Sequence, residues 1–67
     1  MNTRVVIKSY YDSKKEKQFK EVRGVFQQWG ETILFYDEKH FSITVAIVLG
    51  DDGNVYIAPP EAMSISE

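Results

Sequence analysis

The stretch that decides the fold runs from Phe41 to Leu49 and reads Phe-Ser-Ile-Thr-Val-Ala-Ile-Val-Leu. Larger apolar residues alternate along it with smaller or more polar ones, and this period of two is the pattern of a β-strand. We expect the face with the larger side chains to point into the core; its members are Phe41, Ile43, Val45, Ile47 and Leu49. The opposite, smaller and more polar face carries Ser42, Thr44, Ala46 and Val48.

A turn and a second strand follow this stretch. Residues 50–54 read Gly-Asp-Asp-Gly-Asn, a cluster of the kind that closes hairpins, and residues 55–58 resume a strand. The two strands, 41–49 and 55–58, are therefore predicted to form a hairpin. Pro59 and Pro60 end the second strand, because proline cannot donate a hydrogen bond to the ladder.

Residues 13–30 fit two different structures. Ser13-Lys-Lys-Glu16 matches a helix capping box, and apolar residues follow it at helical spacing, namely Phe19, Val22, Phe26 and Trp29. Against a helix, Gly24 in its middle costs about 1 kcal/mol relative to alanine. The same residues also work as the two faces of a twisted strand. With strands predicted at 3–11 and 32–36, the choice is between an all-β barrel and an α+β fold with a helix at about 14–29 packed on an antiparallel sheet.

Composition excludes several classes of protein. Sixty-seven residues, of which 43% are hydrophobic and 13% aromatic, predict a single folded domain over 1–67. The sequence has no cysteine and one histidine, His40, and it has neither a glycine-rich phosphate loop nor a nucleophile beside a base. We therefore expect no enzyme activity, no catalytic residue, no metal and no cofactor. The longest apolar stretch has five residues and the N-terminus lacks signal-peptide features, so a soluble cytoplasmic protein is expected.

Charge is segregated along the chain, although the net charge is only −2. Residues 1–24 hold seven basic and three acidic residues, whereas residues 25–67 hold one basic and seven acidic residues. A basic segment flanked by aromatic residues can attract an acidic partner and supply apolar contact area. The predicted partner-binding residues are accordingly Tyr11, Lys14, Lys15, Lys17, Lys20 and Trp29. The alternatives are a core position for Trp29 and a merely solvated loop for the lysines.

Two motifs resemble a group of phage proteins. Residues 26–30 read Phe-Gln-Gln-Trp-Gly, and residues 44–61 read Thr-Val-Ala-Ile-Val-Leu-Gly-Asp-Asp-Gly-Asn-Val-Tyr-Ile-Ala-Pro-Pro-Glu. Over residues 22–66 the chain thereby resembles small uncharacterised phage and prophage proteins of Gram-positive bacteria. The resemblance implies an accessory protein that binds a host or phage protein.

The ending of the chain is similar to the C-terminal half of SH3-like barrels. In both, a hairpin and a proline precede a single helical turn, here 61–63, and a short closing strand, here 64–66. This resemblance implies that residues 26–29 lie on a strand, and the fold expected is a small five-stranded SH3-like barrel. The chain departs from peptide-binding SH3 domains, because it has no tandem tryptophans and carries Ala62-Met63 where the family places a tyrosine. A groove for proline-rich ligands therefore lacks most of its walls.

The function expected is that of a non-enzymatic protein-interaction module, which the phage resemblance would make a modulator or inhibitor of a host protein or defence system. The alternative is a nucleic-acid-binding small barrel that uses the basic segment 14–23. The sequence pI of about 5.3 weighs against that alternative. A third hypothesis is self-association through unprotected edge strands.

Overall fold

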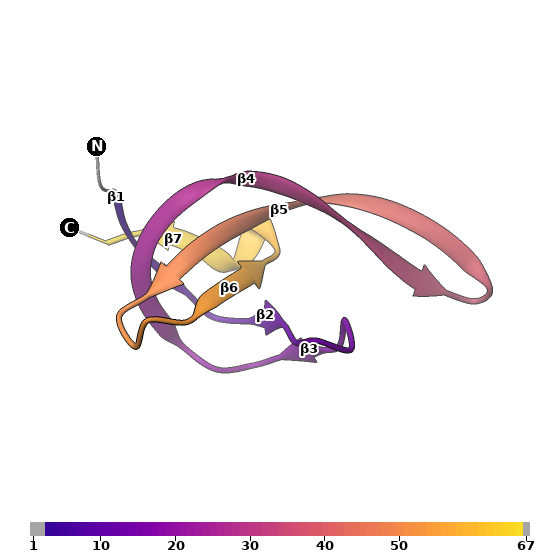
Figure 1. Ribbon diagram of the computed structural model, residues 1–67, viewed down its shortest axis with the longest axis horizontal. Coiled ribbons are helices and arrows are strands. Elements are labelled where there is room, and N and C mark those ends of the chain that lie inside the picture. Colours follow the sequence, from indigo (N-terminus) through magenta and orange to yellow (C-terminus); the bar gives the residue numbers. More distant parts are fainter. Residues whose placement is uncertain (1–2, 67) are drawn as a thin grey trace.

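The chain forms one antiparallel sheet that curls on itself into a half-barrel (Figure 1). The computed structural model describes residues 3–66, except for the side chain of Tyr36. The elements are β1 (Thr3–Ile7), β2 (Tyr10–Tyr11), β3 (Lys17–Gln18), β4 (Val22–Tyr36), β5 (Lys39–Gly50), β6 (Val55–Ala58), the 3-10 helix η1 (Pro60–Ala62) and β7 (Met63–Ile65). Their order in the sheet is β3-β2-β6-β5-β4-β1-β7.

The all-β prediction is confirmed, with seven strands instead of five. The alternative helix at about 14–29 is wrong, because β3 and most of β4 occupy that segment. The predicted hairpin of residues 41–49 and 55–58 is confirmed as β5 and β6, paired from Ala46–Ala58 to Leu49–Val55. The hydrogen bonds that β4 makes to β1 and β5 outweigh the helical spacing of its apolar residues. Tertiary pairing of this kind overrides a weak local propensity.

β4 and β5 form a long hairpin whose outer part extends beyond the half-barrel (Figure 1). They pair from Gly24–Gly50 to Tyr36–Lys39. Only their inner parts have a second neighbour, since β1 pairs with residues 22–26 and β6 pairs with residues 46–49. Residues 28–45, which pair with no described strand other than β4 and β5 themselves, project from the half-barrel in Figure 1. We call this segment the arm and the rest of the molecule the body.

The core lies inside the curl of the body and is built from small side chains. Its fully buried members are Val5, Ile7, Ala46, Val48 and Ala58. Ala46 and Ala58 are directly paired on neighbouring strands, so the tight curl is filled where it leaves least room. Tyr10 and Tyr56 pack against this cluster with their ring centroids 4.8 Å apart.

The prediction that the larger side chains of residues 41–49 supply the core is wrong for the main cluster, although Ile43 and Ile47 are half-buried. Ala46 and Val48, from the face expected to be polar, point into the core, whereas Leu49 and Phe41 are exposed. Val45 is buried as expected, but its alternation with Ala46 places it on the other face of β5. The physical reason is the curl of the sheet, which turns the face of Ala46 and Val48 toward Val5 and Ile7 and leaves Phe41 and Leu49 outside.

A β-bulge marks the start of the arm. The pairing of β4 with β5 shifts register between Phe26 and Gln28. In a regular strand Phe26 and Trp29 would lie on opposite faces, because they are three residues apart. The extra residue brings them to the same face, where Phe26 pairs with Val48 and Trp29 with Ala46, and their ring centroids lie 5.1 Å apart.

Candidate interaction surface

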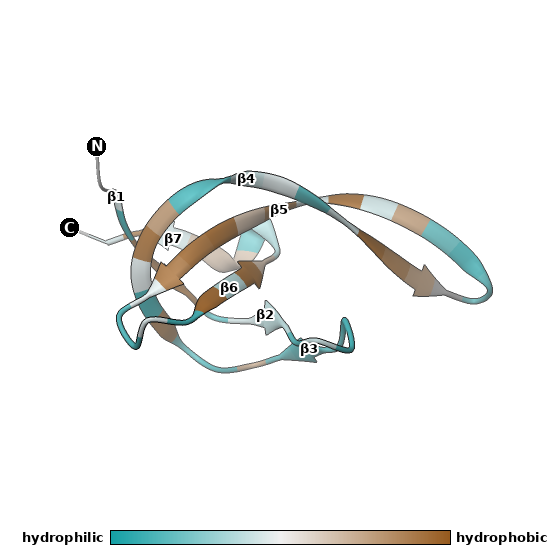
Figure 2. Ribbon diagram, in the orientation of Figure 1, coloured by the Kyte–Doolittle hydropathy of each residue, from teal (hydrophilic) through white to brown (hydrophobic). Residues whose placement is uncertain are grey.

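The arm carries a line of exposed apolar side chains on one face of β4. We call Trp29, Ile33 and Phe35 the apolar stripe; they are 54%, 53% and 72% exposed. Odd-numbered positions beyond the bulge share a face, so the three side chains point the same way. Figure 2 shows that the end of β4 is as hydrophobic as parts of the body. The residues paired with them on β5 are small or polar, namely Ala46, Ser42 and His40.

Glu31 interrupts the apolar stripe. It lies on the same face between Trp29 and Ile33, it is exposed, and it pairs with Thr44 on β5. It is the one charged residue between Arg23 and Asp37 in the sequence. Glu31 makes no ion pair with any of the described side chains.

The tip of the arm is acidic and conformationally unusual. Asp37 and Glu38 connect β4 to β5 and have φ angles of 52° and 62°. Two-residue hairpin turns with left-handed backbone at both positions favour asparagine, aspartate or glycine first and glycine second. Asp37 therefore suits its position, whereas Glu38 stands where glycine fits the backbone better. Next to the tip, the rings of Phe35 and His40 meet edge to face with their centroids 4.4 Å apart.

The other face of the arm rests on the loop between β2 and β3, residues 12–16. Nζ of Lys15 donates a hydrogen bond of 2.6 Å to Oγ1 of Thr32, and Thr32 is only 8% exposed. A pocket of about 310 Å³ lies between loop and arm, lined by Lys14, Lys15, Glu16, Leu34 and Phe35. The loop thus fixes the position of the arm relative to the body.

The loop itself is organised by one carboxylate. Oδ1 of Asp12 accepts hydrogen bonds from the backbone N–H groups of Lys14 and Glu16, at 2.9 and 3.0 Å. The amide of Gln18 donates to the other oxygen of Asp12 at 2.9 Å. The N–H of Glu16 makes the largest contribution to lowering the pKa of Asp12 from its ordinary value. Lys15 follows with a φ of 64°, a left-handed conformation that glycine or asparagine adopts more easily.

The predicted partner-binding residues do not form one continuous surface. Nζ of Lys17 lies 6.0 Å from the centroid of the Tyr11 ring and 5.9 Å from that of Phe19. Trp29 is on the opposite face of the sheet from Tyr11, because the pairing places Trp29 in one row with Ala46 and Ala58, and Tyr11 in the next row with Ile47 and Ile57. Lys14 and Lys15 lie against the arm.

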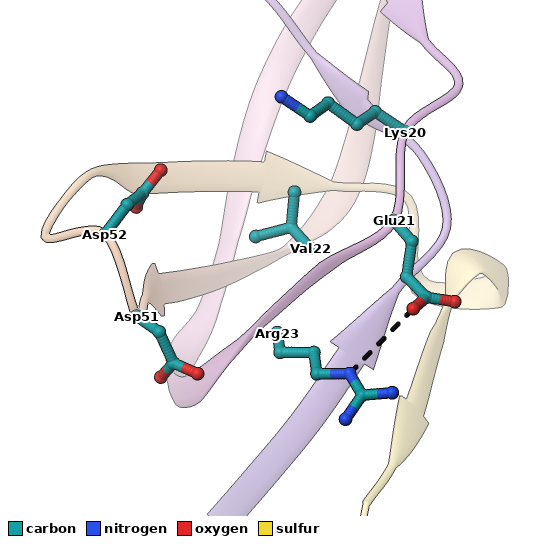
Figure 3. Close-up of a pocket in the computed structure, with 6 residues that line it drawn as sticks. All are labelled: Lys20, Glu21, Val22, Arg23, Asp51 and Asp52. Atoms are coloured by element: carbon teal, nitrogen blue, oxygen red, sulfur yellow. Dashed lines mark ion pairs between the residues drawn. The ribbon is translucent and has the colours of Figure 1, made fainter.

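The remaining predicted contact, Lys20, belongs to a second pocket of about 220 Å³ (Figure 3). Its other lining residues are Glu21, Val22, Arg23, Asp51 and Asp52. Figure 3 shows Lys20 and Glu21 on the segment before β4, Val22 and Arg23 at the start of β4, and the two aspartates on the turn between β5 and β6. The dashed line in that figure is the ion pair of Arg23 Nε with Glu21 Oε2, at 3.8 Å.

The aspartates of this pocket are engaged within the chain. Arg4 donates two hydrogen bonds to Asp51, at 3.0 and 2.8 Å, and they lower the pKa of Asp51. The hydroxyl of Tyr56 donates to Oδ2 of Asp52 at 2.5 Å, which lowers the pKa of Asp52 and raises that of Tyr56. The carboxylates therefore hold the turn in place.

Sequence reasoning selected Trp29 but missed Ile33, Phe35 and Glu31. Their alternation along residues 29–35 was a readable signal for a two-faced strand. The sequence did not indicate that β4 continues beyond the residues that pair with β1, so that its outer part extends past the half-barrel (Figure 1).

Among residues 3–66, no group of three or more His, Asp or Glu side chains is placed to hold a metal ion. Within the same part of the chain, no helix has the length and apolarity needed to cross a membrane. No protein family, curated protein or solved structure matches the chain.

Proposed function

We propose that the chain is a non-enzymatic protein-interaction module and that the arm is its main contact surface. The observation that carries the proposal is the apolar stripe, whose three large side chains are each more than half exposed on a projecting hairpin. A domain of 67 residues has few large apolar groups with which to stabilise a core. Leaving Trp29, Ile33 and Phe35 outside gives up that stabilisation, and a tryptophan beside other exposed apolar groups is typical of interface hot spots.

The lysines of the predicted contact surface have a different place in this proposal. Lys14, Lys15, Lys17 and Lys20 are exposed and do not interrupt the apolar stripe. Their role as contacts for an acidic region of a partner stays a prediction. In such an arrangement they would speed association by electrostatic attraction, while the apolar stripe would slow dissociation.

The sequence resemblances support a more specific version. The likeness of residues 22–66 to small phage and prophage proteins supports a module that acts in the host cytoplasm and modulates or inhibits a host protein or defence system. The short helix η1 before β7 supports placing the half-barrel among variants of the SH3-like barrel.

The experiment compares three tagged proteins in capture from a lysate of a Gram-positive bacterium. They are the wild type, a stripe variant (Trp29→Ser, Ile33→Ser, Phe35→Ser) and a control variant (Phe19→Ser, Val55→Ser, Ile65→Ser). The three control residues are 83%, 64% and 69% exposed and lie outside the arm, so both variants lose three exposed apolar side chains. Circular dichroism checks that both variants fold.

We expect quantitative mass spectrometry to find proteins that the wild type and the control capture and the stripe variant does not. If all three proteins capture the same set, the arm is not the contact surface and the proposal is wrong.

A nucleic-acid-binding function is the second candidate, favoured by Lys17 beside the rings of Tyr11 and Phe19. Cations next to stacking aromatics are the elements of single-strand binding sites. Binding of mixed-sequence single-stranded DNA and RNA would then weaken steeply with salt and be lost in a Lys14→Glu, Lys15→Glu, Lys17→Glu variant. Absence of binding at low salt excludes this candidate.

A further inference from the structure

Glu31 places one negative charge within the apolar stripe, between Trp29 and Ile33. Same-face neighbours on a strand are about 7 Å apart, so the carboxylate stands roughly that far from Trp29 on one side and Ile33 on the other. A partner that covers the apolar stripe also removes water from Glu31. A carboxylate that loses water without gaining a cation is costly, so the covering surface must supply one.

A second copy of the arm does not meet this requirement. If two arms packed stripe against stripe with antiparallel β4 strands centred on Thr32, Glu31 would face Ile33 of the second copy. If they were centred on Glu31, two carboxylates would meet. The stripe itself holds no basic residue that could satisfy either arrangement. The chemistry of the arm therefore favours a different partner over self-association.

The tip of the arm is also negatively charged. Over residues 28–45 the acids Glu31, Asp37 and Glu38 outnumber the single base Lys39. Asp37 suits its left-handed position, and Glu38 beside it occupies one that glycine would fill more easily, so the tip carries two adjacent acids. A field of this sign attracts basic partners and repels acidic ones.

We infer that the arm binds a partner segment in which a lysine or arginine stands between apolar residues. The cation pairs with Glu31, and the apolar residues cover Trp29, Ile33 and Phe35. This inference rests on the proposed function and adds the chemistry of the partner. Glu31 then acts as a specificity-determining residue, because it rejects segments with an acidic or apolar residue at the central position.

The test selects peptides from a displayed library of random twelve-residue sequences. The immobilised proteins are the wild type, Glu31→Lys, the stripe variant and Glu61→Lys. Glu61 is an exposed acid on η1, so Glu61→Lys changes net charge equally without touching the arm. We expect the wild type and Glu61→Lys to enrich peptides with a base flanked by apolar residues. Glu31→Lys should enrich peptides with an acid at that place, and the stripe variant should enrich neither.

One enriched basic peptide is then synthesised and titrated. We expect Glu31→Gln to weaken its binding about two- to fivefold, as for loss of one partly exposed ion pair, and Glu31→Lys to weaken it further through repulsion. A different outcome is that the wild type and Glu31→Lys enrich peptides of the same composition, which the stripe variant does not enrich. That result overturns this inference and leaves the proposed function standing, because Glu31 would then serve only to keep the arm soluble. Equal enrichment by wild type and stripe variant overturns the proposed function as well.

Sedimentation of the protein without peptide tests the remaining possibility, which is that a second copy of the chain covers the arm. A dimer at micromolar concentration that disappears in the stripe variant would show that a second copy covers the arm, and it would overturn the inference. We expect a monomer for the wild type and for Glu31→Lys.

Discussion

The body and the arm share the strands β4 and β5, but the two ends of these strands are stabilised differently. In the body, β5 has a neighbour on each side, and Ala46 and Val48 are fully buried. In the arm each strand has one neighbour, and a two-stranded ribbon is marginal in water. The arm keeps its place through the Lys15–Thr32 hydrogen bond and the burial around it. One pair of strands can therefore stabilise a fold at one end and present a surface at the other.

The largest expected effect comes from the same substitution made in each region. Ile7 is fully buried in the body and Ile33 is half exposed on the arm. We expect Ile7→Ala to lower the free energy of unfolding by about 2–5 kcal/mol, which nearly unfolds a domain of this size. Ile33→Ala should change it by about 0.5 kcal/mol or less. Urea denaturation of both variants is the measurement, and equal losses would show that the arm belongs to the core.

Two glycines, Gly24 in the body and Gly30 in the arm, extend the comparison of the two regions to how closely their strands pack. A Cβ on Gly24 would overlap the carbonyl oxygen of Leu49 and lie 2.8 Å from Cα of Gly50, both backbone atoms that cannot move aside. A Cβ on Gly30 would lie 2.8 Å from Cδ1 of Ile47, the end of a flexible side chain. We expect Gly24→Ala to cost about 3 kcal/mol and Gly30→Ala less than about 1 kcal/mol. Thermal unfolding measures both, and a harmless Gly24→Ala would contradict the close approach of β4 and β5.

The contact between the arm and the loop predicts a change in motion more than in stability. Lys15→Gly relieves the left-handed backbone but removes the hydrogen bond to Thr32, so the two effects, each about 1 kcal/mol, should nearly cancel. Amide hydrogen exchange of residues 28–36 should nevertheless become faster. Lys15→Arg keeps a donor and should leave the exchange rates unchanged. Unchanged rates in Lys15→Gly would mean that the arm needs no tether.

The smallest effect concerns the turn at the far end of β5 from the arm. The pKa of Asp52 is lowered by the Tyr56 hydroxyl, so its contribution to stability is present above about pH 4 and lost as the pH falls through the folded value. The pKa of Tyr56 is raised from 10.0, so its contribution is present below pH 10.0 and lost as the pH rises through the folded value. We expect Tyr56→Phe to narrow the difference in melting temperature between about pH 8 and pH 11. An identical alkaline decline in both proteins would contradict this role of the hydrogen bond.

Local patterns predicted the strands better than they predicted the faces. The turn at residues 50–54 and the two prolines predicted the β5–β6 hairpin because turn chemistry acts on neighbours in sequence. The face of β5 depends on how tightly the sheet curls, which is a long-range property. A rule that sends the larger side chains inward therefore chose Ile47 and Leu49 over Ala46 and Val48.

The candidate surface was predictable only in part, for a similar reason. Charge segregation is visible in the sequence, and it led to the lysines and to Trp29. The exposure of Ile33 and Phe35 follows from the unequal lengths of β4 and β1, which no local pattern records. Regular alternation would also place Trp29 on the face opposite to Phe26, and the bulge brings the two residues to the same face.

That bulge is also a place where the chain can lose a residue. Gln27 is the residue with no partner in β5, so removing it alone would restore regular pairing and leave Gln28 opposite Ile47 and Trp29 opposite Ala46. Because paired residues share a face, Ile33 and Phe35 would stay on the outward face. The loss of three nucleotides would thus remove the local bend of β4 at the base of the arm and leave both the candidate surface and the core sequence unaltered.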